Sequence, residues 1–352
     1  MDKILQWFGD RANRDINRAR DFWNGKGRCL ASMTSLESMY RQLDDMDKMA
    51  ALAVENLKDQ ARLPGVNIPT LIADFGTVTT AKYWGGKAYR DSTGENISIE
   101  RAAKSVDEAL AINPKRVDDP EMDAALGIKF YREVCRRLNT SHLWLRAGDL
   151  QGPLNTASLV MSDEEFLIEL YTDPDKIHQF LDRVTVLLIK YVQYTQKQAD
   201  NKIAGSIWPW IFQPPQFGFG MTEDMMPFLS PDVYKQFGIP YVKRMTDVLG
   251  PVQIHCCGKW GHHAQNLAES GAAIRSVEFW YPHTTFEELK PLADNGVVFV
   301  PYISLDKCDG RFKTLEDYFR YLLDNTPDNY RFWFSFVGET PEGCEFIRDC
   351  SL

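Results

Sequence analysis

The sequence contains no long apolar run, and this absence excludes a membrane-spanning helix. Such a helix needs about 20 consecutive apolar residues, and no stretch of the 352 residues approaches that length. The opening segment, MDKILQWFGDRANRD, is charged from its second position and lacks the apolar core of a signal peptide. We therefore expect a cytoplasmic protein that does not contact membranes.

Clusters of basic residues are also missing. The chain has 40 Lys and Arg against 49 Asp and Glu, which gives a net charge of −9. Nucleic-acid binding depends on clustered cations that neutralise phosphates. The composition therefore argues against a nucleic-acid-binding protein.

The cysteines do not fit a disulfide framework. There are seven, an odd number, in a long chain with no secretion signal. In a reducing compartment, cysteines serve more often as metal ligands or as small buried apolar residues.

Apolar runs typical of strands alternate with helical patterns along most of the chain. The strand-like runs are Cys29–Met33, Pro69–Phe75, His142–Leu145, Ile203–Ile207, Val252–Cys256, Ile274–Phe279, Val297–Tyr302 and Arg331–Phe336. The helical stretches are Met46–Ala61, Met122–Leu138, Pro174–Ala199, Pro231–Val248, Trp260–Ala268, Thr285–Asn295 and Leu315–Asp324. Such alternation predicts an α/β fold with a parallel sheet. Eight strands predict one (β/α)8 TIM barrel over residues 28–352. A charged amphipathic pattern at the start predicts an N-terminal helical extension over residues 1–27.

The Pro- and aromatic-rich segment Trp208–Gly220 follows a predicted strand. In a barrel this segment would lie over the carboxyl-terminal face, where active sites are found. It either lines a pocket there or packs as a surface loop.

One strand ends in residues that can bind a metal. In Val252–Gly258, VQIHCCG, side chains alternate between the two faces, so His255 and Cys257 point one way and Cys256 the other. Nitrogen and thiolate ligands suit zinc, and a third ligand usually comes from elsewhere in the chain. The alternative is a buried histidine with two core cysteines.

A second segment offers the third ligand. Val337–Phe346, VGETPEGCEF, follows the last predicted strand and carries Glu339 and Cys344 in a Gly/Pro turn. In a closed barrel this loop shares a rim with His255, so Cys344 can complete the set. Cys350 is the competing donor.

Three carboxylates also follow or end predicted strands. Asp74 ends the run PTLIAD, Asp306 ends YISLD, and Glu278 lies in SVEFW. Carboxylates at the carboxyl ends of barrel strands are often catalytic. Glu278 is also a candidate fourth ligand or a group that orients a ligand.

Several landmarks in order resemble the uroporphyrinogen decarboxylase superfamily over about residues 28–346. They are Leu71–Asp74 followed by Gly85–Gly86, Gly152–Pro153 with Thr156, the helix Pro174–Tyr191, the segment Leu229–Arg244, and Ile303–Asp306. True uroporphyrinogen decarboxylases carry an arginine-containing N-terminal motif that binds substrate carboxylates. The corresponding segment Ala31–Ser38, ASMTSLES, has no arginine.

His255-x-Cys257 with the downstream Cys344, in Pro341-x-Gly-Cys344, is similar to the zinc motif of another branch. That branch comprises cobamide-dependent methyltransferases that resemble methylcobamide:coenzyme M methyltransferases. The resemblance implies a Zn²⁺ site of His255, Cys257 and Cys344. It also implies a corrinoid carried by a partner protein, and a small thiol, methoxy or methylamine substrate.

Other interpretations stay open. One is a metal-free decarboxylase or lyase that uses Asp74, and another is a barrel that binds a corrinoid protein without catalysis. The printed chain ends soon after Cys344, where relatives continue into a last barrel helix, so that helix is either absent or replaced by the N-terminal one. The oligomeric state is expected to be monomer or homodimer.

The alternation of side chains in the strand gives a first test. Cys257→Ala should abolish zinc binding, whereas Cys256→Ala should retain it, because only Cys257 shares a face with His255. Elemental analysis of the purified variants measures this. Equal loss of zinc in both variants would disprove the assignment of faces.

Overall fold

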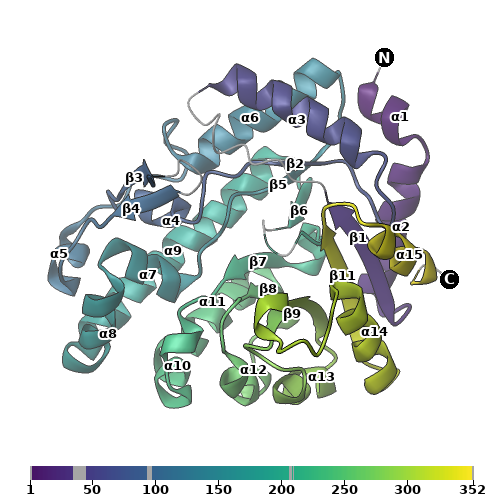
Figure 1. Cartoon of the computed structure of the whole chain (residues 1–352). Coiled ribbons are helices and arrows are strands. Elements are labelled where there is room, and N and C mark those ends of the chain that lie inside the picture. Colours follow the sequence, from purple (N-terminus) through teal and green to yellow (C-terminus); the bar gives the residue numbers. More distant parts are fainter. Residues whose placement is uncertain (1, 35–44, 93–96, 206–207, 209, 351–352) are drawn as a thin grey trace.

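The computed structural model describes residues 2–34, 45–92, 97–205, 208 and 210–350 (Figure 1). Strands lie at the centre of the molecule, with helices around them. In this described part, no helix is long and apolar enough to cross a bilayer.

The strands form two parallel sheets and one small hairpin. The larger sheet has the order β1-β11-β10-β9-β8-β7, and the smaller has the order β2-β5-β6. Their bounds are β1 Cys29–Thr34, β2 Thr70–Ile72, β5 Trp144–Arg146, β6 Ile203–Gly205, β7 Phe219–Thr222, β8 Val252–His255, β9 Ile274–Tyr281, β10 Val298–Ile303 and β11 Arg331–Val337. All described pairings in these sheets are parallel, as the sequence predicts. The hairpin pairs β3 Lys87–Arg90 with β4 Ile97–Glu100.

Isolated bridges connect the two sheets. Gln151, beyond the end of β5, pairs with Thr222 of β7, and Ser32 of β1 pairs with Gly65 before β2. The described pairings thus give an α/β fold with parallel sheets joined by isolated bridges, and closure into a ring of eight strands stays a prediction.

The helices account for most of the remaining chain. The α-helices are α1 Lys3–Phe8, α2 Arg11–Trp23, α3 Met46–Gln60, α4 Thr79–Lys82, α5 Val106–Ala111, α6 Asp123–Leu138, α7 Pro153–Val160, α8 Asp163–Thr172, α9 Pro174–Gln198, α10 Pro231–Phe237, α11 Ile239–Leu249, α12 Ala264–Glu269, α13 Lys290–Asp294, α14 Leu315–Asn325 and α15 Pro341–Asp349. The 3-10 turns are η2 Pro215–Phe217, η3 Met226–Phe228, η4 Gly261–His263, η5 Glu287–Leu289 and η6 Leu305–Lys307.

Two differences from the sequence prediction bear on the candidate site. Strand β7 was not predicted, because the short, glycine-containing run FGMT follows a Pro-rich segment and carries no strand periodicity. Helix α15 lies where a turn was predicted. Its N-cap Thr340 accepts a hydrogen bond from the backbone of Gly343, and Pro341 follows at the first helical position, where its missing N–H costs nothing.

The N-terminal segment forms two helices where one was predicted. Gly9, with φ of 53°, ends α1 because it tolerates a positive φ. In α2, the indole of Trp23 stacks on Trp333 of β11 with ring centroids 5.4 Å apart. Trp23 Nε1 donates to the carbonyl of Phe212 at 2.7 Å. Arg331, the first residue of β11, also bonds the carbonyl of Phe22, so α2 lies at the amino end of that strand.

Trp23 should therefore be a major contributor to stability. Its side chain is 2% exposed, and truncation of a buried tryptophan costs about 3–5 kcal/mol. We expect Trp23→Ala to lower the free energy of unfolding by about that amount in urea denaturation. Leu5→Ala, at a position that is 41% exposed, is the control and should change it by less than about 0.5 kcal/mol. Equal values for the two variants would show that α2 is not part of the folded core.

Candidate metal centre

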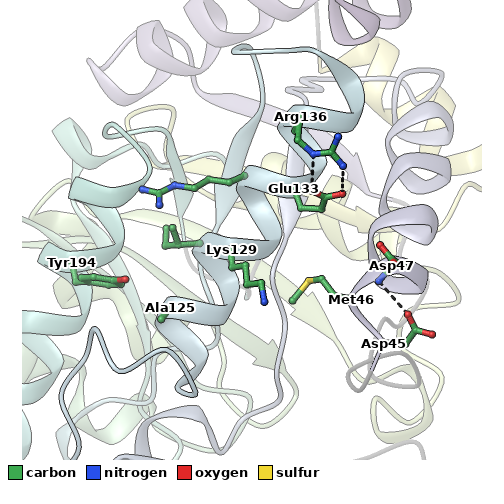
Figure 2. A pocket seen from close by; sticks show the side chains of 10 residues that line it. Asp45, Met46, Asp47, Ala125, Lys129, Glu133, Arg136 and Tyr194 are labelled. Carbon is green, nitrogen blue, oxygen red and sulfur yellow. Dashed lines mark hydrogen bonds and ion pairs between the residues drawn. The ribbon is translucent and has the colours of Figure 1, made fainter.

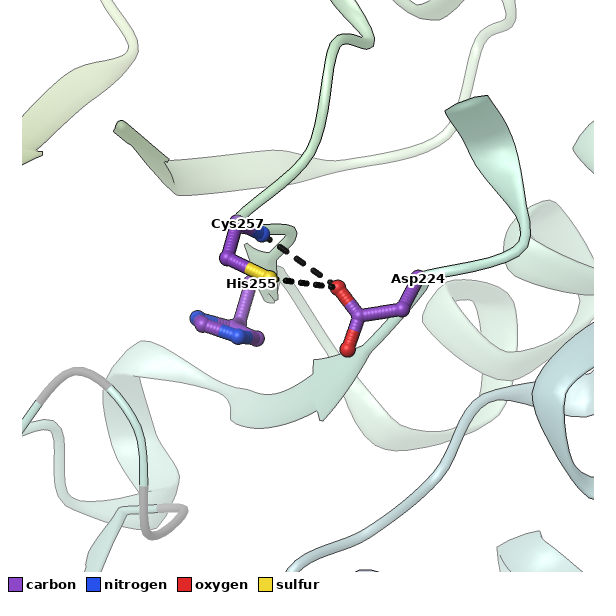
Figure 3. A group of neighbouring side chains, drawn as sticks. All are labelled: Asp224, His255 and Cys257. Carbon is purple, nitrogen blue, oxygen red and sulfur yellow. Dashed lines mark hydrogen bonds between the residues drawn. The ribbon is translucent and has the colours of Figure 1, made fainter. Parts of the chain in front are cut away.

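Three side chains that can bind a metal meet at the carboxyl ends of neighbouring strands. His255 ends β8, Cys257 lies two residues further on, and Asp224 lies two residues beyond the end of β7. Their ligand atoms all lie within 4.8 Å of one another. Figure 3 shows the imidazole, the thiol and the carboxylate pointing toward a common space. The parallel pairing of β7 with β8, in which Thr222 lies opposite His255, brings these strand ends together.

Glu278 fixes the ring of His255. His255 is only 6% exposed, and its Nδ1 forms a short hydrogen bond with Glu278 Oε2. Trp280 Nε1 donates to the other carboxylate oxygen of Glu278 at 2.8 Å. Because Nδ1 is engaged, Nε2 is the ring nitrogen left to bind a metal, the arrangement by which carboxylates commonly orient histidine ligands.

The charge state of His255 depends strongly on these neighbours. Burial lowers the pKa of His255, but the Glu278 carboxylate and the Cys257 side chain raise it, and the net pKa lies well above the usual value. Without a cation, the imidazole therefore keeps its proton. A metal that binds Nε2 has to displace that proton, so binding is coupled to pH.

Cys257 is the accessible member of the cluster. It is exposed, and its backbone N–H and its thiol contact Asp224 Oδ1 at 3.3 and 3.7 Å. Cys256 is fully buried instead, and burial raises the pKa of its thiol well above the ordinary value. The two cysteines thus have opposite environments, and only Cys257 meets His255.

The donor set fits zinc. One imidazole nitrogen, one thiol sulfur and one carboxylate oxygen are ligands that Zn²⁺ accepts, and three protein ligands leave a position for substrate. The exposed Cys257 places that position at the surface of the rim.

Cys344, the third ligand implied by the sequence resemblance, lies outside the described cluster. It is in the first turn of α15, and its thiol contacts Glu339 Oε1 at 3.8 Å. Cys350, the competing donor, lies against Cys29. Sequence reasoning missed Asp224, because the strand that places it, β7, was not recognised.

The three predicted carboxylates are not members of the cluster of Asp224, His255 and Cys257. Asp74 follows β2, and its Oδ1 accepts a hydrogen bond from the backbone of Gly76 at 2.9 Å. Asp306 is exposed in η6, after β10. The structure joins Glu278 directly to His255, and it does not bring Asp306 into the cluster.

Two buried carboxyl groups at the same rim were not anticipated. Asp149 is 3% exposed, and Thr222 Oγ1 donates to its Oδ1 at 3.0 Å. Burial and the nearby charge of Asp74 raise the pKa of Asp149 to about 7. Glu223 is 1% exposed, and burial and Asp224 raise its pKa to about 8. In sequence, Asp149 follows a Gly in a loop and carries no motif signal.

Part of the aromatic segment Trp208–Gly220 reaches the centre. The Trp208 ring lies 5.9 Å from that of His255 and is nearly parallel to it. It also meets Trp280 edge-on at 6.5 Å. Trp208 thus forms an apolar wall beside the imidazole.

A separate surface cavity does not belong to this centre. A volume of about 720 Å³ lies between α3 and α6 and is lined by residues such as Met46, Lys129 and Tyr194 (Figure 2). Glu133 and Arg136 pair with each other at its edge. Its lining contains none of the metal-binding candidates.

Comparison with known proteins identifies the family. Residues 89–293 match the family model described as uroporphyrinogen decarboxylase (URO-D). The chain belongs to the uroporphyrinogen decarboxylase family. This match confirms the superfamily predicted from the sequence landmarks.

One of the solved structures similar to this chain shows the same fold. A methyltransferase from Methanosarcina mazei superposes with a TM-score of 0.62 at 13% identity, covering 92% of this chain and 93% of that one. A protein described as a vitamin-B12-independent methionine synthase from Listeria monocytogenes gives a TM-score of 0.45 at 10% identity, with 96% and 92% covered. The comparison with curated proteins finds no match.

The raised pKa of Asp149 predicts a pH-dependent stability. Its folded pKa of about 7 lies above the unfolded value near 3.9, so stability is lost as pH rises from about 4 to about 7. Asp149→Asn removes this loss. In protein stripped of metal by chelation, the variant should gain up to about 4 kcal/mol on wild type between pH 4 and 8, measured by urea denaturation. Asp309→Asn, an exposed control, should gain nothing, and a gain for Asp149→Asn that is independent of pH would refute the assignment.

Proposed function

We propose that this protein is a zinc-dependent methyltransferase of the uroporphyrinogen decarboxylase family. It moves a methyl group between a corrinoid carried by a partner protein and a small thiol, methoxy or methylamine substrate. The observation that carries the proposal is the meeting of His255, Cys257 and Asp224 within 4.8 Å at the carboxyl ends of parallel strands. Active sites of parallel α/β folds lie at this edge.

His255 and Cys257 would hold the metal, with Asp224 or Cys344 as the third ligand. Asp224 is supported by its ligand atom lying within 4.8 Å of those of His255 and Cys257, and Cys344 by its match to the motif of the methyltransferase branch. When bound, Zn²⁺ lowers the pKa of a coordinated thiol, so that a substrate thiol is kept as a reactive thiolate near neutral pH.

The residues around the candidate ligands are proposed to orient the histidine, shield it from water and transfer a proton. Glu278 orients His255 and, with Trp280, keeps its Nδ1 occupied. Trp208 shields one face of the imidazole from water. Asp149, whose pKa lies near 7, holds or releases a proton at its carboxyl oxygen as the substrate thiol or leaving group changes charge.

The corrinoid is proposed to arrive at the same rim. Cys257 is exposed there, so a macrocycle presented by a docked protein can approach the substrate position. A buried cluster would not permit that approach.

A second candidate function rests on the carboxyl pair. Asp74 lies close enough to Asp149 for its charge to raise the Asp149 pKa. Two carboxyl groups of which one keeps a proton near pH 7 suit acid–base chemistry without a metal, as in a decarboxylase or lyase.

Metal content separates these proposals. We expect about one zinc per chain, and a 10- to 100-fold or greater loss of zinc affinity in His255→Ala and Cys257→Ala. Asp224→Ala and Cys344→Ala compete for the third position, and whichever variant loses zinc identifies the ligand. Elemental analysis and competition with a chromophoric chelator measure this, with Cys308→Ala, at a buried cysteine outside the cluster, as the matched control.

The activity test uses methylcobalamin and a small thiol such as 2-mercaptoethanol. The zinc-loaded wild type should transfer the methyl group, and Cys257→Ala should not. A protein that purifies without zinc and binds none when supplied would contradict the methyltransferase proposal and favour the acid–base alternative at Asp74 and Asp149.

A further inference from the structure

Two cysteines far apart in sequence meet at the end of the fold opposite the metal centre. Cys29 Sγ and Cys350 Sγ are 2.7 Å apart, across 321 positions of sequence. A disulfide bond has a sulfur–sulfur length of about 2.05 Å, so only a small approach separates the two thiols from bonding. Neither cysteine belongs to the metal cluster.

We propose that Cys29 and Cys350 form a reversible disulfide that fastens helix α15 to strand β1. Cys29 is the first residue of β1, and Cys350 follows the last residue of α15. Figure 1 shows α15 beside β1, near the C-terminus.

The position of the pair separates it from the candidate active site. Cys29 begins its strand and therefore lies at the amino end of the parallel sheet, whereas His255 ends β8 at the carboxyl end. Oxidation of this pair need not involve Cys257.

The buried face of the last turn of α15 packs on the core, and its exposed face makes weaker contacts. Phe346 packs against Phe334 with ring centroids 5.1 Å apart and is 1% exposed. Beyond it, Arg320 pairs with Asp349 at 2.9 Å, with both side chains about half exposed. Exposed ion pairs contribute little, but Ile347 in the same turn is 1% exposed, so the thiol contact adds to an apolar anchor at the residue that follows the helix.

The two thiols are suited to unequal roles. The hydrogen bond with Cys350 and the charge of Arg28 lower the pKa of Cys29, while the same contact and burial raise the pKa of Cys350. Cys29 is therefore the thiolate that attacks, and Cys350 is the thiol that resolves.

The oxidant is a low-molecular-weight disulfide such as oxidised glutathione. The Cys29 thiolate attacks one of its sulfurs, which forms a mixed disulfide and releases one glutathione thiolate. Cys350 then loses its proton and attacks the Cys29 sulfur, which forms the protein disulfide and releases the second glutathione. The protein gives up two electrons and two protons, and the small disulfide is reduced to two thiols.

The bond would close nearly the whole chain into one loop. Cross-linking residues this far apart restricts the unfolded ensemble and adds a covalent tie at the end of α15. Because α15 also carries Cys344, the disulfide fixes the helix that bears a candidate ligand.

The full-length protein is equilibrated in glutathione buffers from fully reduced to fully oxidised, and free thiols are then blocked with an alkylating reagent. Peptide mass spectrometry should find a Cys29–Cys350 cross-link that lacks two hydrogen atoms and is reversed by reduction. The remaining cysteines should be alkylated: Cys135, Cys256, Cys257, Cys308 and Cys344. Hydrogen exchange across the last turn of α15 should slow at least several-fold on oxidation.

Variants make the result specific. Cys29→Ser and Cys350→Ser should abolish both the cross-link and the slowing, while Cys135→Ser, at another half-buried cysteine, should retain both. A persistent glutathione adduct on Cys29 without a cross-link would overturn the proposal, as would a cross-link that leaves exchange in α15 unchanged.

Zinc content, measured on the same samples, keeps this inference separate from the proposed function. Cys350→Ser should bind as much zinc as wild type. Loss of zinc in that variant would place Cys350 among the metal ligands and overturn the disulfide role.

Discussion

The hydrogen bond between Glu278 and His255 is the contact on which the candidate centre depends. Both side chains are almost fully buried, and a buried charge is stable only when it is paired. Glu278 therefore fixes the imidazole, and β8 and β9 must keep their register for the pair to form. Cys257, two residues after the imidazole, follows from that placement, so one buried pair sets the direction of two candidate ligands.

The rim around this pair carries more buried carboxyl groups than a purely structural site would keep. Asp149 and Glu223 are buried, and burial raises the pKa of each above that of an ordinary carboxyl group. Neither oxygen of Glu223 has a hydrogen-bond partner among the described residues. Buried groups of this kind destabilise the fold and are found mostly where function requires them. A divalent cation bound at Asp224 would offset part of the electrostatic repulsion between Asp224 and these buried carboxyl groups. We therefore expect metal binding to increase the free energy of unfolding.

The sequence predicts the features that follow from the periodicity of apolar residues, namely the faces of a strand and the order of strands and helices. Alternation within VQIHCC separates Cys256 from its neighbours, and the structure places them in the environments that alternation requires. The parallel α/β class follows equally well from the order of strands and helices. Asp224 was missed because β7 is short and its pairing with β8 is a long-range contact that no local pattern encodes. Asp149 depends on burial by distant elements, which is invisible to sequence spacing.

Helix α15 has one cysteine near each of its ends, Cys344 in its first turn and Cys350 after its last residue. It starts just past the carboxyl end of β11 with Cys344 in its first turn, and its last turn leads into Cys350 at the amino end of β1. A helix is stiff along its axis, so a constraint at one end also limits movement of the other. For Cys344 to reach His255, α15 or the segment before it has to shift, whereas Asp224 needs no such movement. Asp224 is therefore the candidate ligand that already lies beside His255 and Cys257, and Cys344 is the candidate whose contribution depends on how firmly α15 is held.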